Sequence, residues 1–394
     1  MKVLVVHNSY QQYGGEDSVV RMESELLALR GDSVHFYCVS NDCISSFFKK
    51  LLSAIGATFS FGSYWSIRRL IRKLKPDVVH VHNFFPLISP SVFYACRAER
   101  APVVFTLHNY RIVCPTALLM RDGVVTERSL HEGPWWALKY KVYRGSLVGT
   151  FFLCLMIWLH QRLGTWRDRV DRFIVLSQFA KERFVLAGLP LDRLVVKPNF
   201  VDIPRPVERD RSGLLFVGRL SPEKGVEVLM SAAIFARGEG NMNLDAVDIV
   251  GDGPLEEQVR QSGLSWLGAL PGDQVKERMQ SARALLLPSI WYEGFPMVLV
   301  EAYACGLPVI ASRRGAMAEL VDDGVTGLLF EAGDAGDLAQ KMRWATDHPE
   351  EMGKMGLAAR ERYEAKYTKE INYVQLMAVY EDAIGVAKRE EVSV

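Results

Sequence analysis

Residues 293–301 read Glu-Gly-Phe-Pro-Met-Val-Leu-Val-Glu, and the segment Cys305-Gly306-Leu307-Pro308 follows them closely. The first acid, Glu293, closes a loop, a short apolar helix follows, and the second acid, Glu301, lies on that helix. A helix that leads directly into a short apolar strand is typical of an α/β domain with a parallel sheet. Two acids on either side of a Gly-Phe-Pro turn suit a ligand with hydroxyl groups at both ends and negative charge between them. A nucleotide sugar is such a ligand.

Short apolar, β-branched segments recur along the chain and predict two α/β domains. They are residues 3–7, 34–39, 78–81, 103–107 and 173–176 in the first half, and 214–217, 246–250, 284–287, 308–311 and 327–330 in the second. Segments that are apolar throughout indicate strands covered on both faces, and the helical stretches between them predict doubly wound parallel sheets. The polar segment 201–213, with two prolines, predicts a linker, and residues 369–388 predict a long C-terminal helix.

The 394 residues carry a net charge of only +1, but the charge is unevenly distributed. Residues 1–200 contain 26 Lys and Arg against 15 Asp and Glu, a net charge of +11, whereas residues 201–394 contain 21 against 31, a net charge of −10. The basic half suits an anionic surface such as a membrane face, although opposite charges can also simply help two halves to pack. Nucleic acid is not expected, because no nucleic-acid fold signature accompanies the charge.

The cysteines and the first residues indicate the compartment. Six scattered cysteines without a Cys-x-x-Cys pair favour a reducing compartment and disfavour both disulfides and a zinc site. Residues 1–8 contain only a four-residue apolar run, which predicts a first strand rather than a signal peptide. We therefore expect a cytoplasmic protein.

Residues 147–159 depart from the general pattern, because this segment is apolar on all sides. Its thirteen residues are too few to span a bilayer, which needs about 20. Lysines and arginines flank it on both sides, so it is either a buried core helix or a helix that dips into a membrane interface. The basic amphipathic stretches 47–52 and 67–75 lie in the same half and favour membrane contact.

Histidine and asparagine residues follow three of the predicted strands, as His7-Asn8, His82-Asn83 and His108-Asn109. The carboxyl ends of parallel strands lie at one edge of a sheet, so these side chains can converge there. They could contact sugar hydroxyls or a developing charge, and their spacing does not match a zinc finger or a His-Glu-x-x-His helix.

Two loops are candidates for an anion site. Gly14 and Gly15, in Tyr13-Gly14-Gly15-Glu16, precede a predicted helix and allow close approach of the backbone to a ligand, although a plain turn explains them equally well. In Gly218-Arg219-Leu220-Ser221-Pro222-Glu223-Lys224-Gly225, Ser221 is expected to cap a helix, with Arg219 and Lys224 flanking its N-terminus. Two cations and a helix dipole would hold a diphosphate. The chain has no Asp-x-Asp pair, so we expect the cations to replace a metal ion.

The sequence resembles the family 4 retaining glycosyltransferases, which have the GT-B fold, over nearly its whole length. The most specific stretches are Glu-x7-Glu at 293–301, 218–225 and 306–312, with agreement also at 197–202, 250–254 and 324–327. The resemblance implies two Rossmann-like doubly wound domains that face a central cleft. They would be an acceptor-binding domain of residues 1–200, a linker of 201–213 and a nucleotide-sugar-binding domain of 214–368. The helix 369–394 would cross back to pack on the N-terminal domain.

The resemblance also implies roles for individual residues. Arg219 and Lys224 would hold the donor diphosphate, Glu301 the ribose hydroxyls and Glu293 the hydroxyls of the donor sugar. His108 would lie beside the transferred sugar and complete the catalytic group. The other expected donor contacts come from the main chain and from glycines, namely Gly14, Gly15, Gly251, Gly294, Phe295, Pro296, Met297 and Val298.

Two stretches differ from the family pattern. Residues 314–319 lack the Gly-Gly pair that the family usually has before its next acid, which makes Glu319 a less certain donor contact. Phe295-Pro296 replaces a frequent Phe-Gly, and because proline has no amide hydrogen, one main-chain contact to the donor is expected to be lost.

The predicted reaction moves a sugar from a nucleoside-diphosphate donor to an acceptor hydroxyl with retention at the anomeric carbon. Cations would stabilise the leaving diphosphate. Glu293 is expected to bind the sugar rather than to attack it, since no second carboxylate stands beside it as in retaining hydrolases. A nucleotide-sugar 2-epimerase of the same fold and a non-catalytic saccharide-binding protein are the alternatives.

The predicted setting is polysaccharide or lipid-linked oligosaccharide assembly. Its expected partners are a nucleotide sugar, a saccharide or lipid-linked acceptor, and the inner membrane face, which the basic N-terminal half would contact peripherally. Neither a metal ion nor a cofactor is expected.

Overall fold

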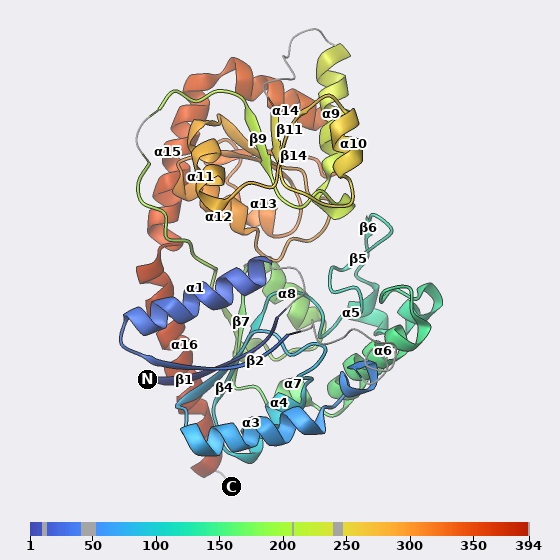
Figure 1. The fold of residues 1–394 in the computed structure, drawn as a ribbon, viewed down its shortest axis with the longest axis vertical. Coiled ribbons are helices and arrows are strands. Elements are labelled where there is room, and N and C mark those ends of the chain that lie inside the picture. The colour runs from blue at the N-terminus through green and yellow to red at the C-terminus, as the bar shows by residue number, and fades with distance from the viewer. Residues whose placement is uncertain (10–13, 41–52, 207–208, 239–246, 393–394) are drawn as a thin grey trace. The chain divides into compact units, whose positions relative to one another are not determined.

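The computed structural model describes residues 1–9, 14–40, 53–206, 209–238 and 247–392, which form two compact units (Figure 1). Unit 1 comprises Met1–Leu119, Thr126–Pro198 and Asn372–Val394, and unit 2 comprises Met120–Val125 and Asn199–Ile371. Tyr13 and the basic stretch 47–52 of the sequence analysis lie outside the described residues.

Unit 1 is built on a six-stranded parallel sheet with the strand order β2-β1-β3-β4-β7-β8. Its strands are β1 (Lys2–Ser9), β2 (Ser33–Ser40), β3 (Val78–Val81), β4 (Val103–Leu107), β7 (Arg172–Val175) and β8 (Leu194–Val196). The order reverses between β1 and β3, which is characteristic of a doubly wound sheet and confirms the predicted class. The central strands β3 and β4 are completely buried because helices cover both faces.

The helices of unit 1 follow the strands in alternation. They are α1 (Gly15–Leu29), α3 (Phe61–Leu74), α4 (Ser91–Ala98), α5 (Arg128–Glu132), α6 (Leu147–Arg162), α7 (Thr165–Asp168) and α8 (Gln178–Leu186), with the 3-10 turns η2 (Trp135–Tyr140) and η3 (Leu191–Arg193). Ser60, Ser146 and Ser177 cap α3, α6 and α8 by accepting a backbone N–H with the side-chain hydroxyl.

The C-terminal helix α16 (Lys369–Val392) joins unit 1 from Asn372 onward. It buries Leu376, Tyr380 and Ala383 completely. The phenol of Tyr380 lies 2.8 Å from Nδ1 of His80 on β3, and Asp382 pairs with Arg172 at the start of β7. A helix that comes from the far end of the sequence therefore completes the core of the N-terminal sheet.

Unit 2 has a second six-stranded parallel sheet, with the order β11-β10-β9-β12-β13-β14. Its strands are β9 (Leu214–Val217), β10 (Val247–Val250), β11 (Ser265–Gly268), β12 (Ala284–Leu287), β13 (Val309–Ser312) and β14 (Gly327–Phe330). Its helices are α9 (Val226–Gly238), α10 (Glu256–Gln261), α11 (Gly272–Ser281), α12 (Met297–Ala304), α13 (Ala316–Leu320), α14 (Ala335–Asp347) and α15 (Pro349–Lys366), with the 3-10 turn η4 (Pro222–Lys224). The hairpin of β5 (Met120–Arg121) and β6 (Val124–Val125) is grouped with this unit.

Three strands of the two six-stranded sheets differ from the prediction. β8 and β11 were missed, because β8 has only three residues and β11 (Ser-Trp-Leu-Gly) is half-buried rather than apolar throughout. β2 is the edge of its sheet and is not covered on both faces, since Phe36 is 51% exposed.

Segment 147–159 belongs to α6, which is buried on one side only. Leu153, Cys154, Met156 and Ile157 are in the core, whereas Leu147, Phe151 and Trp158 are exposed by 54%, 42% and 37%. Of the two alternatives for this segment, a fully buried core helix is therefore wrong. Among the helices of the described residues, none is long and apolar enough to cross a membrane.

Candidate active site

The predicted donor-binding residues of unit 2 follow neighbouring strands at one edge of the sheet. Arg219 follows β9, Gly251 follows β10, and Glu293 lies between β12 and α12. Because these strands are parallel, the loops after them emerge at the same carboxyl edge. The sheet therefore gathers a guanidinium, a flexible glycine and a carboxylate on one side of unit 2.

Glu293 is the centre of this group. Its side chain is buried, with 5% of the residue exposed, and Oε1 accepts two hydrogen bonds. The ammonium of Lys224 donates one at 2.6 Å, and the hydroxyl of Ser289 donates the other at 2.8 Å. Charge-assisted hydrogen bonds of this kind offset the cost of burying a carboxylate. The structure thus joins two of the predicted catalytic residues directly.

The main chain holds Lys224 in this position. The amide of Ile290 donates to the carbonyl of Glu223 at 3.0 Å, which ties the turn η4 to the loop after β12. Nζ of Lys224 also lies 5.7 Å from the ring centre of Trp291, a cation–π contact. Lys224 is about one-quarter exposed, so its ammonium faces both the carboxylate and the solvent.

The predicted helix cap at Ser221 is wrong in its details. Ser221 does precede a turn with Pro222 in its first position, but the turn is the three-residue 3-10 helix η4, and α9 begins only at Val226. The hydroxyl of Ser221 donates to the carboxylate of Glu223 at 2.7 Å instead of capping a backbone amide. Arg219 therefore precedes a 3-10 turn and Lys224 ends it, and neither lies at the N-terminus of an α-helix.

Arg219 lies on the exposed part of the same loop. Among the residues that the structure describes, none forms a hydrogen bond or ion pair with its guanidinium, which leaves all its donors available to a ligand. Its loop is fixed by backbone bonds from Gly218 to Val250 and from Leu220 to Asp252. At Gly251, with φ +141°, a Cβ atom would lie 1.9 Å from the carbonyl oxygen of Gly218, so only glycine allows the loops after β9 and β10 to approach so closely.

The first turn of α12 carries the remaining predicted contacts of this unit. Pro296 occupies the position before the helix, and Met297 and Val298 begin it, where main-chain amides have no partner within the helix. Burial raises the pKa of Glu301, which lies one turn further along α12. Phe295 is buried, and its ring centre lies 5.9 Å from that of Tyr367, which anchors the loop that also contains Gly294.

The loop after β13 contacts the loop that carries Glu293. Nη1 of Arg314, the first residue of the stretch 314–319, donates to the carbonyl of Ile290 at 2.6 Å and so braces the loop of Glu293. Glu319 lies in the short helix α13 that follows.

Histidines from the neighbouring strands β3 and β4 converge in unit 1. Nδ1 of His82, after β3, lies 3.1 Å from Nε2 of His108, after β4, and the two rings are stacked with centres 5.4 Å apart. His80 contacts His82 with ring centres 4.0 Å apart. Burial lowers the pKa of His108 to about 3, so its imidazole is neutral at physiological pH.

Gly14 and Gly15 stand at the start of α1. The amide of Gly14 donates to Oδ2 of Asp17 at 3.0 Å, and Oδ1 of the same carboxylate lies 2.8 Å from Nε2 of His7 on β1. Asp17 thereby connects the glycine loop to the end of the first strand. Because Gly14 carries no side chain, its backbone remains accessible beside this pair.

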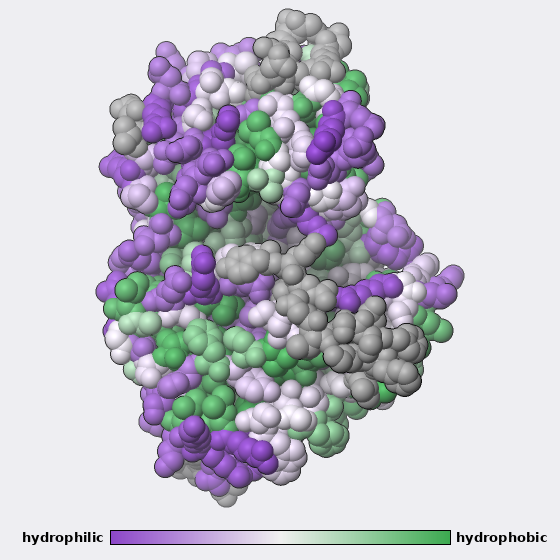
Figure 2. All heavy atoms as spheres, viewed as in Figure 1, coloured by the Kyte–Doolittle hydropathy of each residue, from purple (hydrophilic) through white to green (hydrophobic). Residues whose placement is uncertain are grey.

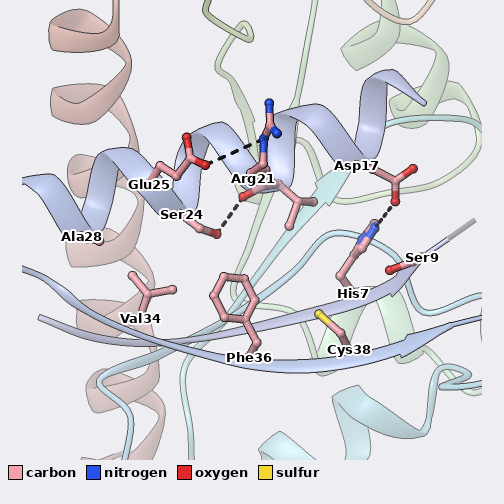
Figure 3. Close-up of a pocket in the computed structure, with 11 residues that line it drawn as sticks. His7, Ser9, Asp17, Arg21, Ser24, Glu25, Ala28, Val34, Phe36 and Cys38 are labelled. Atoms are coloured by element: carbon pink, nitrogen blue, oxygen red, sulfur yellow. Dashed lines mark hydrogen bonds and ion pairs between the residues drawn. The ribbon is translucent and has the colours of Figure 1, made fainter. Parts of the chain in front are cut away.

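A cavity of about 640 Å³ opens between α1 and the strands β1 and β2 (Figure 3). His7 and Asp17 form its polar end, and Val34, Phe36 and Cys38 of β2 form its apolar floor, facing the helix. The cavity exists because β2 is an edge strand that α1 covers only in part.

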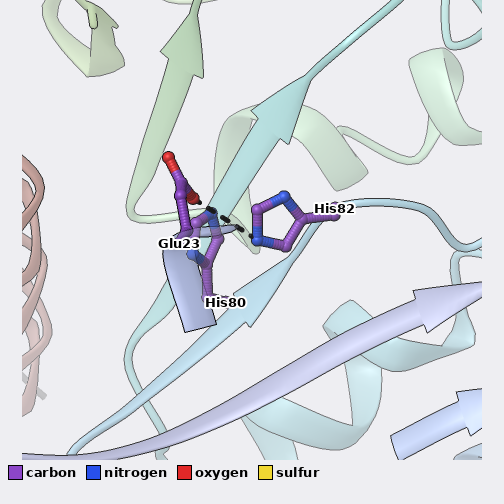
Figure 4. A group of neighbouring side chains, drawn as sticks. All are labelled: Glu23, His80 and His82. Atoms are coloured by element: carbon purple, nitrogen blue, oxygen red, sulfur yellow. Dashed lines mark ion pairs between the residues drawn. The ribbon is translucent and has the colours of Figure 1, made fainter. Parts of the chain in front are cut away.

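Glu23, His80 and His82 approach one another as metal ligands can (Figure 4). Protein groups nevertheless take part of its donor atoms, namely both nitrogens of His80 and Oε1 of Glu23. His80 bonds to Tyr380 through Nδ1 and to Thr106 through Nε2, both at 2.8 Å. The ammonium of Lys197 occupies Oε1 of Glu23 at 2.6 Å. A cation at this position and a histidine with both nitrogens engaged fit a hydrogen-bond network better than a metal centre.

The predicted site residues thus form two groups. Gly14, Gly15 and His108 belong to unit 1. All the others belong to unit 2, namely Arg219, Lys224, Gly251, Glu293, Gly294, Phe295, Pro296, Met297, Val298 and Glu301. The sequence analysis missed Ser289, Asp17, Glu23 and Lys197. Only Glu23 gave a signal, because it falls on the apolar stripe of α1 between Val20 and Leu27.

Comparisons with known families match both parts of the chain. Residues 13–205 match the family described as Glycosyltransferase Family 4, and residues 204–362 match the family described as glycosyl transferases group 1. An uncharacterized glycosyltransferase of Methanocaldococcus jannaschii is 33% identical over 97% of this chain and 98% of its own length. The amylovoran biosynthesis glycosyltransferase AmsK of Erwinia amylovora is 27% identical over 54% of this chain, a match that spans only 56% of that protein.

Solved structures share the fold. HepE of Anabaena, solved in complex with UDP and glucose, superimposes with a TM-score of 0.66 at 17% identity and covers 97% of this chain and 99% of its own. The sucrose-phosphate synthase of Thermosynechococcus elongatus gives a TM-score of 0.69 at 16% identity and covers 98% and 99%.

Proposed function

Because the chain belongs to glycosyltransferase family 4 and has the GT-B fold, we propose that it transfers a sugar from a nucleoside-diphosphate donor to an acceptor hydroxyl, with retention at the anomeric carbon. The observation that carries the proposal is the ion pair between Lys224 and the buried Glu293. Arg219 lies on the loop that leads to Lys224, and no group among the described residues bonds to its guanidinium. Together these residues supply cations for a diphosphate and a carboxylate for sugar hydroxyls.

The ion pair suits a donor site in its unliganded state. A buried carboxylate without a ligand needs a counter-ion, and Lys224 provides it. When a donor binds, its diphosphate competes for the ammonium, and Glu293 gains hydrogen bonds from the sugar hydroxyls in return. The complexes of HepE with UDP and UDP-glucose support a nucleotide sugar as the donor class.

In the proposed reaction the bond between the anomeric carbon and the diphosphate oxygen breaks while the acceptor oxygen forms a new bond on the same face of the sugar. The acceptor proton passes to the departing phosphate. Arg219 and Lys224 stabilise the charge that develops on the diphosphate. Removing one such group from an enzyme typically lowers the rate by roughly 10²–10³-fold. We assign Glu301 to the ribose hydroxyls and His108 to the transferred sugar, and we propose that no metal ion is needed.

The experiment that tests this proposal follows both partners of the reaction. Purified protein is incubated with a panel of nucleotide sugars and saccharide or lipid-linked acceptors in the presence of EDTA, and NMR records the anomeric configuration of the product. We expect transfer with retention, which Arg219→Ala abolishes and Glu293→Gln weakens without trapping a glycosyl-enzyme adduct. An inverted product, a covalent adduct on Glu293→Gln, or full turnover by Arg219→Ala contradicts the proposal.

The same panel without acceptor separates the alternatives. A 2-epimerase would convert the donor sugar to its epimer with no acceptor present. A saccharide-binding protein would bind sugars and convert no donor. A transferase without an acceptor forms no epimer and at most hydrolyses the donor slowly to free sugar.

We further propose that unit 1 contacts an anionic membrane surface from the cytoplasmic side, in polysaccharide or lipid-linked oligosaccharide assembly. The exposed side of α6 carries Phe151 and Trp158, whose rings pack on Trp135 with centres 6.0 and 6.1 Å away. Arg162 lies over Trp158, and Lys139 lies over Tyr140 in the preceding turn η2. Aromatic rings with basic side chains beside them are typical of surfaces that settle at a membrane interface.

A second helix adds to this surface. α3 exposes Phe61 by 71% and Trp65 by 51%, and it buries only Ser63, Ile67 and Ile71. Arg69, Arg72 and Lys73 are exposed as well, and Figure 2 shows hydrophilic residues over part of α3 at the lower edge of the view. This exposed basic side accounts for the amphipathic stretch 67–75 and supports membrane contact by charge.

A further inference from the structure

Four titratable side chains form a continuous line through unit 1, from Lys197 through Glu23 and His82 to His108. Nζ of Lys197 lies 2.6 Å from Oε1 of Glu23. Oε2 of Glu23 lies 3.8 Å from Nε2 of His82, and Nδ1 of His82 lies 3.1 Å from Nε2 of His108. The line connects α1 to the carboxyl ends of β3, β4 and β8.

The first three members are shielded from solvent. The side chains of Lys197, Glu23 and His82 are exposed by 1%, 4% and 2%. Oε2 of Glu23 has no hydrogen-bond partner among the described residues, so it acts on its surroundings through charge. At such burial, electrostatic interactions are several times stronger than at the surface.

The charge states follow from the contacts. Burial alone would raise the pKa of Glu23, but the ammonium of Lys197 holds it below its ordinary value, so the residue is a carboxylate. Burial lowers the pKa of His82 well below its ordinary value, as it does for His108. The chain of contacts therefore runs from a fixed negative charge through two neutral imidazoles.

A hydrogen bond between two neutral imidazoles needs one N–H and one lone pair. Either His108 donates through Nε2 to Nδ1 of His82, or His82 donates in the opposite direction. In the second arrangement Nε2 of His82 would direct its lone pair at the carboxylate of Glu23. In the first arrangement the same atom carries its hydrogen toward the carboxylate, which Coulomb attraction favours.

We infer that Glu23 is a positioning residue that sets the tautomer of His108 through His82. Its carboxylate holds His82 as the Nε2–H tautomer, His108 then donates through Nε2, and Nδ1 of His108 is left as a hydrogen-bond acceptor. Among the residues that the structure describes, none hydrogen-bonds to that nitrogen, so it is available to a ligand. His80 does not disturb this arrangement, because Tyr380 and Thr106 engage both of its nitrogens.

The inference deepens the proposed function and rests on it in one respect, the identity of the ligand. If His108 contacts the transferred sugar, Nδ1 accepts a hydrogen bond from a sugar hydroxyl and does not donate one. His108 then orients the sugar and is not a general acid.

The first test is the tautomer itself, in the unliganded wild-type protein. Nitrogen-15 labelling of the eight histidines and long-range proton–nitrogen NMR distinguish the two tautomers and the imidazolium, and a His108→Gln sample identifies the signal of His108. We expect the Nε2–H form at pH 7. An Nδ1–H form or an imidazolium overturns the inference, and this measurement needs neither donor nor activity.

The second test reverses the direction of the hydrogen bond between His82 and His108. In Glu23→Gln the amide oxygen is expected to face Lys197, so the NH₂ group faces Nε2 of His82 and requires a lone pair there. His82 then donates to His108, and His108 changes to the Nδ1–H tautomer. The matched control is Glu25→Gln on the same helix, an exposed residue paired with Arg21 at 3.8 Å, which is expected to leave the His108 tautomer unchanged.

Kinetics separate this inference from the proposed function. With the donor and acceptor of the wild-type reaction, Glu23→Gln should lower kcat/KM by about tenfold, the effect of one mismatched hydrogen bond, while Glu25→Gln retains the wild-type value. If Glu23→Gln reverses the tautomer of His108 but leaves kcat/KM unchanged, Nδ1 of His108 does not accept a hydrogen bond from the sugar. If His108 keeps the Nε2–H form in folded Glu23→Gln, Glu23 does not set the tautomer. A wild-type protein without transferase activity but with the Nε2–H form of His108 contradicts the proposed function alone.

Discussion

Glu301, the second acid of the stretch 293–301, has a pKa that its surroundings shift. None of the residues that the structure describes forms an ion pair with its side chain, and burial raises its pKa. It therefore takes up a proton at a higher pH than an exposed glutamate does. A protonated carboxyl accepts hydrogen bonds from a ribose less well than a carboxylate.

We predict that donor affinity falls as the pH is lowered through the raised pKa of Glu301. Glu301→Gln should bind donor about tenfold more weakly at pH 7.5 and should lose most of this pH dependence. Titration calorimetry at several pH values measures both. A variant with the same pH dependence as the wild type would remove Glu301 from the binding site.

The same residue has a consequence for stability. A carboxyl group whose pKa is raised in the folded state is destabilising when ionised, so Glu301→Gln should increase the free energy of unfolding at pH 7. The gain should shrink as the pH falls through the raised pKa, because the wild-type residue then becomes neutral too. A loss of stability at pH 7 would mean that the carboxylate has a structural partner.

At the scale of elements, the turn η4 depends on a close backbone approach. Gly225 follows the turn with φ +70°, and a Cβ atom there would lie 1.8 Å from the carbonyl oxygen of Pro288. Gly324 has a similar φ of +78°, but a Cβ atom would meet no atom within 4 Å. The two glycines are therefore a matched pair that differs in contact alone.

Gly324→Ala should cost about 1 kcal/mol, the usual penalty of a left-handed backbone. Gly225→Ala should cost roughly 3 kcal/mol or more, since the backbone must also move away from Pro288. Because that movement displaces Lys224 from Glu293, donor binding should weaken as well. Chemical denaturation and calorimetry provide the two readouts, and equal costs for both variants would contradict the packing described here.

Helix α6 provides the test of membrane contact. Phe151→Ser with Trp158→Ser should weaken sedimentation with anionic phospholipid vesicles by about tenfold, because apolar area exposed to solvent is lost. The control is Leu186→Ser on α8, which removes a side chain exposed by 50%. Added salt should also weaken binding if the basic side chains contribute. Binding to neutral vesicles with equal strength, or no effect of the double variant, would exclude this surface.

At the scale of the whole molecule, α16 completes unit 1 through two tyrosines of different burial. Tyr380 is fully buried and bonds to His80 at 2.8 Å, whereas the half-buried Tyr373 bonds to Asp32 at 3.0 Å. Tyr380→Phe leaves Nδ1 of His80 buried without a partner, so it should cost about 2 kcal/mol of unfolding free energy. Tyr373→Phe should cost less than about 1 kcal/mol, because water can replace its hydroxyl. Similar small losses in both variants would mean that the buried bond is not formed.

Most of the architecture could be predicted from the sequence, because strands buried on both faces are apolar throughout. β3, β4, β9 and β12 begin and end where the apolar runs do. β8 could not be predicted because three apolar residues are too few to stand out as a strand, and β11 because its sequence Ser-Trp-Leu-Gly mixes polar and aromatic residues as a loop does. Each becomes a strand by pairing with the strand before it in the chain, β7 and β10.

The site was predictable where it follows a motif and unpredictable where it depends on distant contacts. The loop positions of Arg219, Lys224 and Glu293 follow from strand ends, whereas Ser289 becomes a partner of Glu293 only through the turn of its loop. Lys197 reaches Glu23 across 174 positions of sequence, which no local pattern indicates. The exposed face of α6 could not be predicted either, because the buried and exposed sides of this helix have the same apolar composition.

The central claim, a nucleotide-sugar site formed by Arg219, Lys224 and Glu293, is tested most directly by titration calorimetry of a nucleotide-sugar panel in EDTA. We predict that one nucleoside-diphosphate sugar binds the wild type, that Arg219→Ala and Lys224→Met each weaken it by at least about tenfold, and that Lys354→Met, an exposed lysine on α15, binds normally. The account is contradicted if no nucleotide sugar binds the wild type, or if the Arg219 and Lys224 variants bind the donor as tightly as the wild type does.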